Sequence, residues 1–553
     1  MKATIAVSEL VPVSDFESAP FLSDRPATLG FSLPGSNARR TRYYWWLALG
    51  VVCAALLLPM FLTEVPPLGD YPNHLARLMV LADNGADPIL RKFFEPHWGI
   101  IPDLGIDLLG TPLLWVLPVH VAGRILLGIA LLIPVFGTVA YSRAVFGRLT
   151  WWSLGCVLVA YNATFMQGFL NFMIGTGLAL LLAAAWIEWR ERAPWRTMAI
   201  AIPGAVVLFF CHLMGLLFFA LLIGSSELAQ LPAFWREPKR LAARVGYGAA
   251  IFVVPMILYR SSELHSMADE TVFLPLGKKL GQLLDPFLNY SLPLDIVTAA
   301  SVAGVLVLAA ATRRLRMPAR SSVALVLVAL IYAAAPSEYK HTYNLDMRFV
   351  IYFGFLMFGG VAPVATRIRH GYLMMAGLAA LFAGRMAILD VVWLGHNRDI
   401  DRLRAIMAHI EPGSLVYVTD VKVEENPVYW DNGPRARRLS NGLRMDPHWP
   451  ALVLIERRAW WPYLFANPSQ QPILNRPVYQ AMADRITHLP GHGELESSDD
   501  FGLCGFDTVL LMMAGGEPDL AHYSVKRLTL IEGNDTAALY RIKPDPTCVP
   551  LNR

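Results

Sequence analysis

Asp70 stands in the stretch from Glu64 to His74 (EVPPLGDYPNH), which follows a long apolar segment and runs into an amphipathic one (LARLMVLAD). Its prolines and glycine stiffen the chain where it leaves the apolar segment, just before a predicted helix. A carboxylate fixed in such a place can act as a general base or hold a divalent metal. The alternative is that Asp70 only begins a turn and that Asn73 caps the helix, because Asp and Pro are common turn residues.

Several basic residues lie at the ends of apolar segments, where they could neutralise a phosphate. Arg348 and Lys340 share the polar stretch PSEYKHTYNLDMR, and His212 lies in FFCHLMG between two further apolar segments. Arginine suits a phosphate best because its planar fork donates two parallel hydrogen bonds. The alternatives are that the cations reach lipid headgroups or pair with nearby carboxylates, and that His212 bonds a carbonyl.

Three more residues of the first long polar segment are candidates for binding a substrate. His74 and Arg77 are one helical turn apart and could lie beside Asp70, or they could face headgroups. Asp103, with Asp107 close by, could supply a second carboxylate if this segment folds back. We assign no cofactor, and a divalent metal between these carboxylates remains an open alternative.

The composition of the chain identifies the class of protein. Of 553 residues, 55% are hydrophobic and only 16% are charged, against about 25% in soluble proteins. A net charge of +4 with scattered basic residues excludes a nucleic-acid-binding protein. The chain is therefore predicted to be a polytopic α-helical membrane protein with the lipid bilayer as a partner.

About eleven segments are long and apolar enough to cross a membrane. Their approximate ranges are 44–64, 121–142, 150–165, 172–188, 198–212, 213–229, 245–261, 292–312, 321–336, 349–366 and 372–394. A further segment, 104–118, contains Asp107 and two prolines and is too short, so we expect an interfacial or re-entrant helix there.

The basic clusters predict how the chain is oriented, since cytoplasmic loops are rich in Lys and Arg. With a cytoplasmic N-terminus, every second junction between segments carries such a cluster. We therefore expect a multi-pass protein of the cell inner membrane with its C-terminal part outside. The expected divisions are a disordered cytoplasmic tail (1–38), a transmembrane domain (39–394) with a large first external loop (65–120), and an extracytoplasmic α/β domain (395–553).

Short patterns predict elements within residues 395–553, called the C-terminal domain below. Residues 415–419 and 508–512 read as buried strands, 527–542 as a hairpin, and 397–410 as a helix that links the domain to the last span. Cys504 and Cys548 could pair in an oxidising compartment. The aromatic stretch 460–465 could form a platform for sugars or rest on the membrane interface.

Arg385 and Asp390 are ionisable residues inside the eleventh segment. Such residues are costly in a membrane and are usually paired or functional. Their spacing of five does not align them on one helix face, so we expect partners on other spans.

The order of these parts resembles the GT-C superfamily of integral membrane glycosyltransferases, which includes protein O-mannosyltransferases and aminoarabinose transferases. The pattern Leu113-Leu114-Trp115 through His120, Ala122 and Arg124 is similar to the segment before that family's second span. The resemblance implies a catalytic role for Asp70, another recurrent position at His212, and donor-phosphate contacts in the loop Pro336 to Arg348. It also implies a GT-C-like fold and an inverting glycosyltransferase that uses a polyprenyl-phosphate sugar donor and acts in envelope glycan or glycolipid synthesis.

The sequence departs from this family in two places. The second external loop, MQGFLN, has no carboxylate, and Asp70 is followed by Tyr71 rather than by a second acidic residue. The expected acceptor of the sugar is a glycan, a lipid or a protein. The alternative function is a transporter or a non-catalytic assembly protein for envelope polysaccharide.

Overall fold

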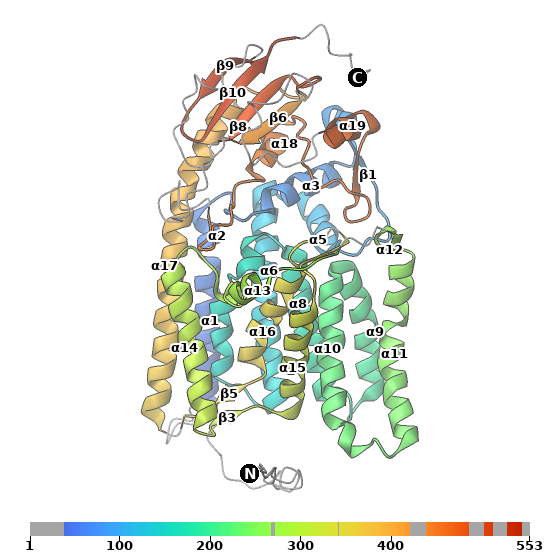
Figure 1. Cartoon of the computed structure of the whole chain (residues 1–553), viewed down its shortest axis with the longest axis vertical. Coiled ribbons are helices and arrows are strands. Elements are labelled where there is room, and N and C mark those ends of the chain that lie inside the picture. The colour runs from blue at the N-terminus through green and yellow to red at the C-terminus, as the bar shows by residue number, and fades with distance from the viewer. Residues whose placement is uncertain are drawn as a thin grey trace, which may run out of the picture.

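The structure, a computed structural model, describes residues 38–266, 271–340, 342–365, 367–420, 438–485, 503–512 and 528–544. Its helices form a long bundle that carries the C-terminal domain at one end, which we call the domain end (Figure 1). The expected tail (1–38) lies outside the described residues except for Ala38, which begins the first helix.

Eight helical stretches in the described part of the chain are long and apolar enough to cross a membrane. They are α1 (Ala38–Leu57) with α2 (Pro59–Leu62), α6 (Val119–Phe146), α8 (Leu170–Trp189), α9 (Pro194–Cys211), α10 (Leu213–Gln230), α11 (Pro238–Arg260), α14 (Leu292–Ala311) and α17 (Ile368–Met407). The prediction of a polytopic helical membrane protein is confirmed.

The three other predicted spans are shorter helices in the same bundle. They are η2 (Trp152–Val159) with α7 (Ala163–Met166), α15 (Ala319–Ala334) and α16 (Leu345–Gly359). The first of them is a tight 3-10 helix followed by a single turn, whose start Asn162 caps by accepting from the amides of Thr164 and Phe165. All eleven predicted segments are thus helical, and the count of eleven spans stays a prediction.

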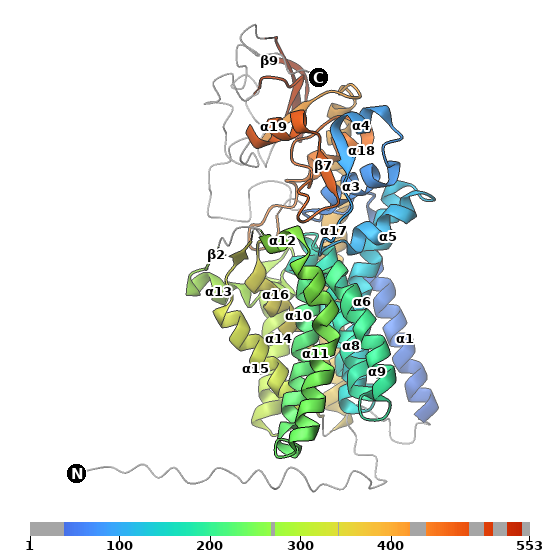
Figure 2. The same ribbon diagram turned by 90° about the vertical axis from the view of Figure 1, so that its right-hand side faces the viewer.

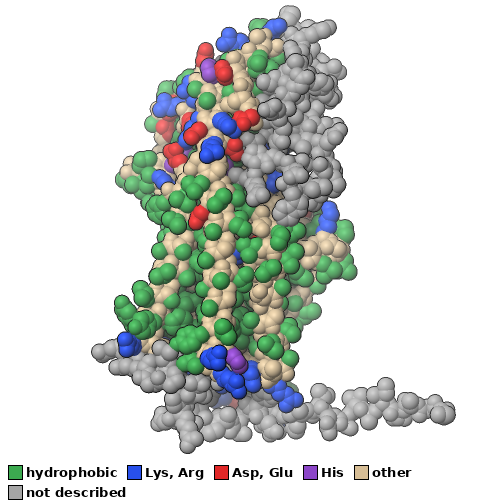
Figure 3. All heavy atoms as spheres, turned by 90° about the vertical axis from the view of Figure 1, so that its left-hand side faces the viewer, with side chains coloured by type: hydrophobic (Ala, Val, Ile, Leu, Met, Phe, Trp, Pro, Cys, Tyr) green, Lys and Arg blue, Asp and Glu red, His purple; other side chains and the backbone are tan. Residues whose placement is uncertain are grey.

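The face formed by α14, α17 and α1 has the surface expected of a membrane protein. Apolar side chains cover the helices, with Lys and Arg below them and mixed charges above, beside the C-terminal domain (Figure 3). Exposed apolar residues on these helices include Val307, Leu308, Leu373 and Val391. Because water would penalise such a band, it indicates contact with lipid.

The inner helices pack closely at small residues. A Cβ atom on Gly177 of α8 would lie 2.4 Å from the carbonyl carbon of Ile133 in α6. No larger residue fits there without moving the backbone, so Gly177 sets the distance between these two helices.

The first loop folds into short elements at the domain end. They are α3 (Tyr71–Asp83), α4 (Pro88–Phe93), β1 (Phe94–Pro96) and α5 (Gly105–Leu114). The last is the short helix predicted in 104–118, and Leu108, Trp115 and Val116 there are exposed. The alternative in which Asn73 caps α3 is wrong, because the helix begins at Tyr71 and the buried Asn73 side chain reaches the C-terminal domain instead.

The C-terminal domain contains a four-stranded sheet in the order β6-β8-β10-β9 (Figure 1). Its strands are β6 (Val416–Asp420), β8 (Thr508–Met512), β9 (Leu528–Gly533) and β10 (Ala537–Ile542). Strand β6 runs parallel to β8, and β9 and β10 form the predicted hairpin. Smaller elements are η6 (Trp449–Ala451), α18 (Leu452–Arg457), β7 (Ile473–Asn475) and α19 (Pro477–Arg485).

Two further predictions for this domain concern its linking helix and its cysteines. The predicted linking helix (397–410) is not a separate element, because α17 continues without a break from the bundle into the domain. Cys504 is disulfide-bonded, as an oxidising compartment would allow, whereas Cys548 lies outside the described residues.

The first loop and the C-terminal domain share one hydrophobic core. Val65, Phe93 and Phe94 of the loop belong to the same buried cluster as Trp449 and Trp460 of the domain. Strands β1 and β7 also pair, with Phe94 opposite Asn475. The domain is therefore built partly from residues before 395, and Figure 2 shows α3 and α4 beside α18.

Short elements connect the remaining helices. They are η3 (Leu231–Ala233), α12 (Glu263–Ser266), β2 (Thr271–Val272), α13 (Leu276–Gln282), η4 (Asp285–Phe287), β3 (Leu315–Arg316), β4 (Glu338–Tyr339) and β5 (Ala362–Pro363). Strand β2 pairs with β4 at the domain end, and β3 pairs with β5 at the opposite end.

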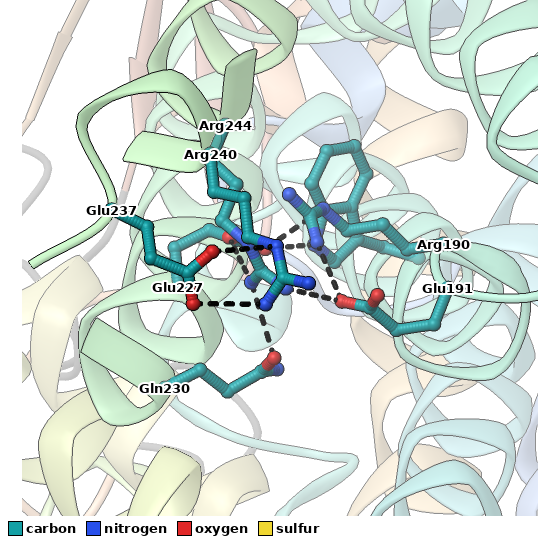
Figure 4. A network of polar contacts seen from close by, with 8 residues as sticks. Arg190, Glu191, Glu227, Gln230, Glu237, Arg240 and Arg244 are labelled. Atoms are coloured by element: carbon teal, nitrogen blue, oxygen red, sulfur yellow. Dashed lines mark hydrogen bonds and ion pairs between the residues drawn. The ribbon is translucent and has the colours of Figure 1, made fainter. Parts of the chain in front are cut away.

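Ion pairs join helices at the end of the bundle that lies away from the C-terminal domain. Arg244 of α11 lies 2.9 Å from Glu227 of α10 and 2.6 Å from Glu191, which follows α8 (Figure 4). Arg190 lies 2.9 Å from the other oxygen of Glu227. These charges are paired with one another, so they hold three helix ends together.

Arg385 has its partner on another helix, as predicted. Its guanidinium donates to Asp295 of α14 at 2.7 Å and to the carbonyl of Phe287 at 2.6 Å, and both charged side chains are buried. Ser440 and the amide of Asn289 donate to the second oxygen of Asp295. The carboxylate and the guanidinium are thereby satisfied within the fold.

Candidate functional site

A cavity of about 1020 Å³ lies between the domain end of the bundle and the C-terminal domain. Its wall includes every residue that the sequence singled out as catalytic or substrate-binding except Arg77: Asp70, His74, Asp103, His212, Lys340 and Arg348. These residues come from the first loop, the α9–α10 turn, the β4–α16 segment and α16. The fold thus collects into one cavity side chains that are far apart along the chain.

The second external loop fixes the backbone of Asp70. The amides of Gly69 and Asp70 donate to the carbonyls of Met166 and Gln167, at 3.0 and 2.8 Å. Gly168 follows with φ +89°, and a Cβ atom there would lie 2.9 Å from the amide nitrogen of Asp70. This loop has no carboxylate of its own, and it serves to hold the carboxylate of the first loop in position.

The carboxyl group of Asp70 points into the cavity and is poised to exchange a proton near neutral pH. Its side chain is 24% exposed and makes no capping bond to α3, although Asp70 is the N-cap residue. Burial raises the pKa of Asp70 from 3.8 to about 7, because it disfavours the charged form, while Arg77 and Arg348 partly offset that effect. A carboxyl with such a pKa suits general base catalysis.

Arg348 and His212 form a corner of the cavity that is rich in hydrogen-bond donors. Nη1 of Arg348 lies 3.0 Å from Nε2 of His212, whose Nδ1 lies 3.0 Å from the amide of Met214. A neutral imidazole carries one N–H, so only one of its nitrogens can accept a bond. If Nδ1 accepts from Met214, then Nε2–H and the guanidinium are two donors facing each other.

Aromatic rings and a carbonyl hold the Arg348 side chain in this corner. Its guanidinium lies 5.2 and 5.6 Å from the ring centres of Phe169 and Phe172, and it donates to the carbonyl of Tyr343 at 3.3 Å. Its Nε atom is buried and has no hydrogen-bond partner among the described residues. The group is therefore fixed in place, and because these contacts use only some of the N–H groups on its terminal nitrogens, donor capacity is left for an anion.

Lys340 and Asp103 complete the charged part of the wall. Lys340 is 7% exposed, and its ammonium donates to the carbonyl of His265 at 2.9 Å. Asp103 has φ +101°, and Asn171 holds its backbone by donating to its carbonyl at 2.7 Å. Its Oδ1 lies 3.9 Å from Nε2 of His212. Burial raises the pKa of Asp103 to about 7, so the cavity holds two carboxyls that titrate in the same range.

Arg77 lies behind the cavity wall rather than on it. It forms a buried two-point ion pair with Asp107 of α5, at 2.8 and 3.0 Å. The pair joins α3 to α5 and so braces the helix that follows Asp70. His74, from the same helix, does line the cavity, and burial lowers its pKa well below the usual value.

The aromatic stretch 460–465 divides between the core and the cavity. Trp460 and Trp461 are fully buried in the shared core, which rules out both the sugar platform and the membrane-interface role for them. Pro462, Leu464 and Phe465 line the cavity instead. The remaining wall on this side carries five uncharged amide side chains, Asn467, Gln470, Gln471, Asn475 and Gln480.

His448 of the C-terminal domain contacts Asp70 and was not found from the sequence. Its Nε2 lies 3.3 Å from Oδ1 of Asp70, and burial lowers its pKa to about 4. The only signal was its position between Pro447 and Pro450 in the run DPHWP, which resembles the proline-rich setting of Asp70. Nothing in the sequence pairs these two segments.

The residues of the cavity do not form a recognisable metal centre. Among the described residues no group of three or more His, Cys, Asp or Glu side chains could hold a metal ion. Asp107, a carboxylate considered for such a site, is engaged with Arg77. We therefore derive no step through a metal.

No known protein family and no curated protein matches the chain. Among solved structures it is similar to ArnT from Cupriavidus metallidurans bound to undecaprenyl phosphate, with 11% identity, 90% of this chain and 97% of that chain covered, and a TM-score of 0.48. It is also similar to ArnT from the same organism in the apo state, with 12% identity, 91% and 98% coverage, and a TM-score of 0.49. This likeness concerns the fold alone, and at these scores it carries no argument.

Proposed function

We propose that this protein is an integral membrane glycosyltransferase of the GT-C type. It would move a sugar from a polyprenyl-phosphate donor to an acceptor on the outer face of the membrane, in envelope glycan or glycolipid synthesis. The observation that carries the proposal is the single cavity in which the Asp70 carboxyl and the Arg348 guanidinium meet at the domain end of the bundle. A base and a fixed cation at that place match the two charges that such a transfer must handle.

In the proposed reaction Asp70 accepts the proton of an acceptor hydroxyl group. The hydroxyl oxygen attacks the anomeric carbon from the face opposite the phosphate, and the bond between that carbon and the phosphate oxygen breaks. The polyprenyl phosphate leaves with the electron pair, so the anomeric configuration inverts. The raised pKa of Asp70, about 7, supports this role because it makes the carboxylate a stronger base than an exposed aspartate.

The donor-rich corner supports a phosphate at Arg348 and His212. A phosphate oxygen between them would accept from the guanidinium and from Nε2–H, while Nδ1 keeps its bond from Met214. Negative charge on this phosphate grows as the sugar departs, so donors fixed beforehand stabilise the transition state more than the ground state. Lys340, on the same wall, adds a further positive charge.

The uncharged amides support the recognition of sugar hydroxyls. Asn475 shows how they are arranged, because its Nδ2 donates to Gln480 at 3.1 Å while its buried Oδ1 has no partner among the described residues. Amides both donate and accept, as sugar hydroxyls do. This part of the wall therefore suits a neutral sugar better than a charged group.

A deletion strain tests the function. Lipid-linked sugars and surface glycans would be profiled in wild type, in the deletion strain, and in the deletion strain carrying wild-type, Asp70→Asn or Asp401→Asn protein. Asp401 is an exposed carboxylate on α17 and serves as the matched control. We expect the deletion to change the profile, Asp401→Asn to restore it, and Asp70→Asn to transfer at least about a hundredfold more slowly.

Two outcomes would contradict this proposal in different ways. Unchanged lipid-linked sugars and glycans in the deletion strain would argue against transferase activity. Full restoration by Asp70→Asn, expressed at the wild-type level, would leave the function standing but remove Asp70 as the base.

A further inference from the structure

The side chain of Asn73 has one orientation that satisfies its surroundings. It is fully buried on α3, its Nδ2 donates to the carbonyl of Tyr463 at 2.8 Å, and its Oδ1 accepts from the amide of Phe465 at 2.9 Å. A backbone carbonyl can only accept and a backbone N–H can only donate. The two ends of the amide are therefore fixed by the backbone of the C-terminal domain.

The orientation of Asn73 fixes which nitrogen of His448 carries the proton. Nδ2 of Asn73 lies 3.1 Å from Nδ1 of His448. Since Nδ2 has only hydrogens to offer, Nδ1 of His448 must accept. A neutral His448 therefore carries its proton on Nε2, the atom that lies 3.3 Å from Oδ1 of Asp70.

The same contacts keep His448 neutral. A protonated imidazole donates from both nitrogens, so Nδ1–H would face the N–H of Asn73 with no acceptor between them. The ring is 7% exposed, with ring centres of Phe465 and Trp461 at 5.0 and 5.9 Å. Burial in this apolar setting acts in the same direction and lowers the pKa of His448 to about 4.

The segment that carries His448 is held by bonds within itself and by bonds to the bundle. Arg444 donates twice to Asp446, at 2.8 and 3.0 Å, and the buried Asp446 accepts through its carbonyl from the amide of Trp449. Earlier in the segment, Ser440 is bonded to Asn289 and to Asp295 of the bundle. His448 is thus held relative to the helices and not only to its own domain.

We propose that His448 is a positioning residue for Asp70, held by Asn73 in the tautomer that donates from Nε2 to the Asp70 carboxylate. The C-terminal domain then completes the active site rather than only covering it. The proposal rests on the proposed function in one respect, since it takes Asp70 to be the base. Donation to one carboxylate oxygen fixes the group and leaves the other oxygen for the acceptor hydroxyl.

The first test measures the tautomer and needs no activity. Protein with ¹⁵N-labelled histidine, in lipid nanodiscs, would be studied by solid-state NMR from pH 5 to pH 8, and the signals of His448 identified by their absence in His448→Gln. We expect a protonated Nε2 and a bare Nδ1 throughout. Asn73→Asp, which offers Nδ1 an acceptor, should move the proton to Nδ1 or give the imidazolium. A wild-type ring that is protonated on Nδ1 at neutral pH would overturn the proposal.

The second test uses the pH dependence of transfer. The titratable and charged groups around Asp70 are His74, Arg77, Asp103, Arg348 and His448. His448→Phe keeps a ring but removes the donor that favours the charged carboxylate, so the acidic limb of the rate profile should move up by about one pH unit. His448→Gln, whose amide can reach the Nε2 position, should keep the limb within a few tenths of a unit of wild type.

The two variants separate positioning from folding. Lower rates in both variants, with wild-type melting temperatures and unshifted pH limbs, would overturn the positioning role. If His448→Phe does not fold, the tautomer measured in the wild type and in Asn73→Asp still decides the question. An inactive Asp70→Asn together with an unshifted His448→Phe profile would refute this inference alone, whereas an active Asp70→Asn would refute the assignment of the base.

Discussion

Asp70 and Arg348 influence one another's chemistry across the cavity. Burial raises the pKa of the carboxyl, and the positive charges of Arg77 and Arg348 lower it only in part. The positive charge of the guanidinium is in turn favoured by the nearby Asp70 carboxylate, and its terminal nitrogens keep N–H donors for a ligand. Asp70 is thus a base that titrates near neutral pH, and Arg348 is a cation with unused hydrogen-bond donors.

The rate of sugar transfer should rise between pH 5 and pH 8 with a midpoint near 7. The base must be deprotonated, and its pKa is raised from 3.8 to about 7, so activity is lost as the pH falls through that value. The measurement is the initial rate across this range with purified protein in nanodiscs. Because the pKa of Asp103 is also raised to about 7, Asp103→Asn is the control and should keep the midpoint. A wild-type midpoint near pH 4 would contradict the assignment.

Replacing Arg348 by lysine should slow transfer although the positive charge remains. A lysine has no planar fork, so one of the two parallel bonds to the phosphate is lost, and the rate should fall about tenfold to a hundredfold. Arg260→Lys is the matched control, since Arg260 is exposed at the same end of the bundle. Equal rates for Arg348→Lys and wild type at every donor concentration would show that no fork is needed.

The sequence identified Asp70 for a local reason and missed His448 for a long-range one. The prolines and the glycine around Asp70 predict a stiff turn at the end of a span. This pattern lies within about ten residues of the sequence. His448 matters because Asn73, Tyr463 and Phe465 meet it in space. Periodicity and residue spacing do not reveal contacts between segments that are distant in sequence. His448 therefore looked like any single histidine in a soluble segment.

At the scale of elements, the turn between α7 and α8 positions the base without contributing any chemistry. The backbone of Met166 and Gln167 accepts from Gly69 and Asp70, and Gly168 permits this close approach. The loop, MQGFLN, carries no carboxylate. The structure gives the loop a mechanical role that residue types alone could not reveal.

Gly168→Ala should impair both activity and stability. Alanine at φ +89° is strained by about 1–2 kcal/mol, and its Cβ would lie 2.9 Å from the nitrogen of Asp70. We expect the melting temperature to fall by a few degrees and the transfer rate to fall about tenfold as Asp70 shifts. Gly377→Ala, in α17 with open space around it, is the control and should change neither. Wild-type activity in Gly168→Ala would show that this approach does not position the base.

The boundaries of helices and strands agree with the sequence prediction where local patterns decide them. They differ from the prediction where contacts between distant segments decide them. Strands β6 and β8 and the β9–β10 hairpin lie where alternation and turn residues predicted them. The linking helix is continuous with the last span because the single glycine between them, Gly395, does not end α17. In the predicted span 150–165 the structure has a short 3-10 helix, η2, whose residues are all buried. Neighbouring helices surround it, so this element does not need the length of a span exposed to lipid.

At the scale of the whole molecule, residues from both sides of position 394 contribute to one hydrophobic core. Phe93 and Phe94 from the first loop lie in the core of the C-terminal domain, and Arg404 bridges Glu64 and Glu456 at 2.9 and 2.8 Å. A hydropathy pattern marks where apolar spans end, but it cannot show which loop enters which core. Asp70 and His448 are held together by this shared core.

Phe93→Ala should therefore loosen residues of the C-terminal domain that are distant in sequence. Phe93 is fully buried, so its truncation should cost about 3–5 kcal/mol in the shared core. Hydrogen–deuterium exchange of the protein in nanodiscs should then speed up in peptides covering residues 449–461 as well as 90–96. Phe61→Ala, at a side chain that is 73% exposed, is the control and should leave 449–461 unchanged. Exchange confined to 90–96 in Phe93→Ala would mean that the loop and the domain unfold independently, and that His448 does not depend on the first loop for its position beside Asp70.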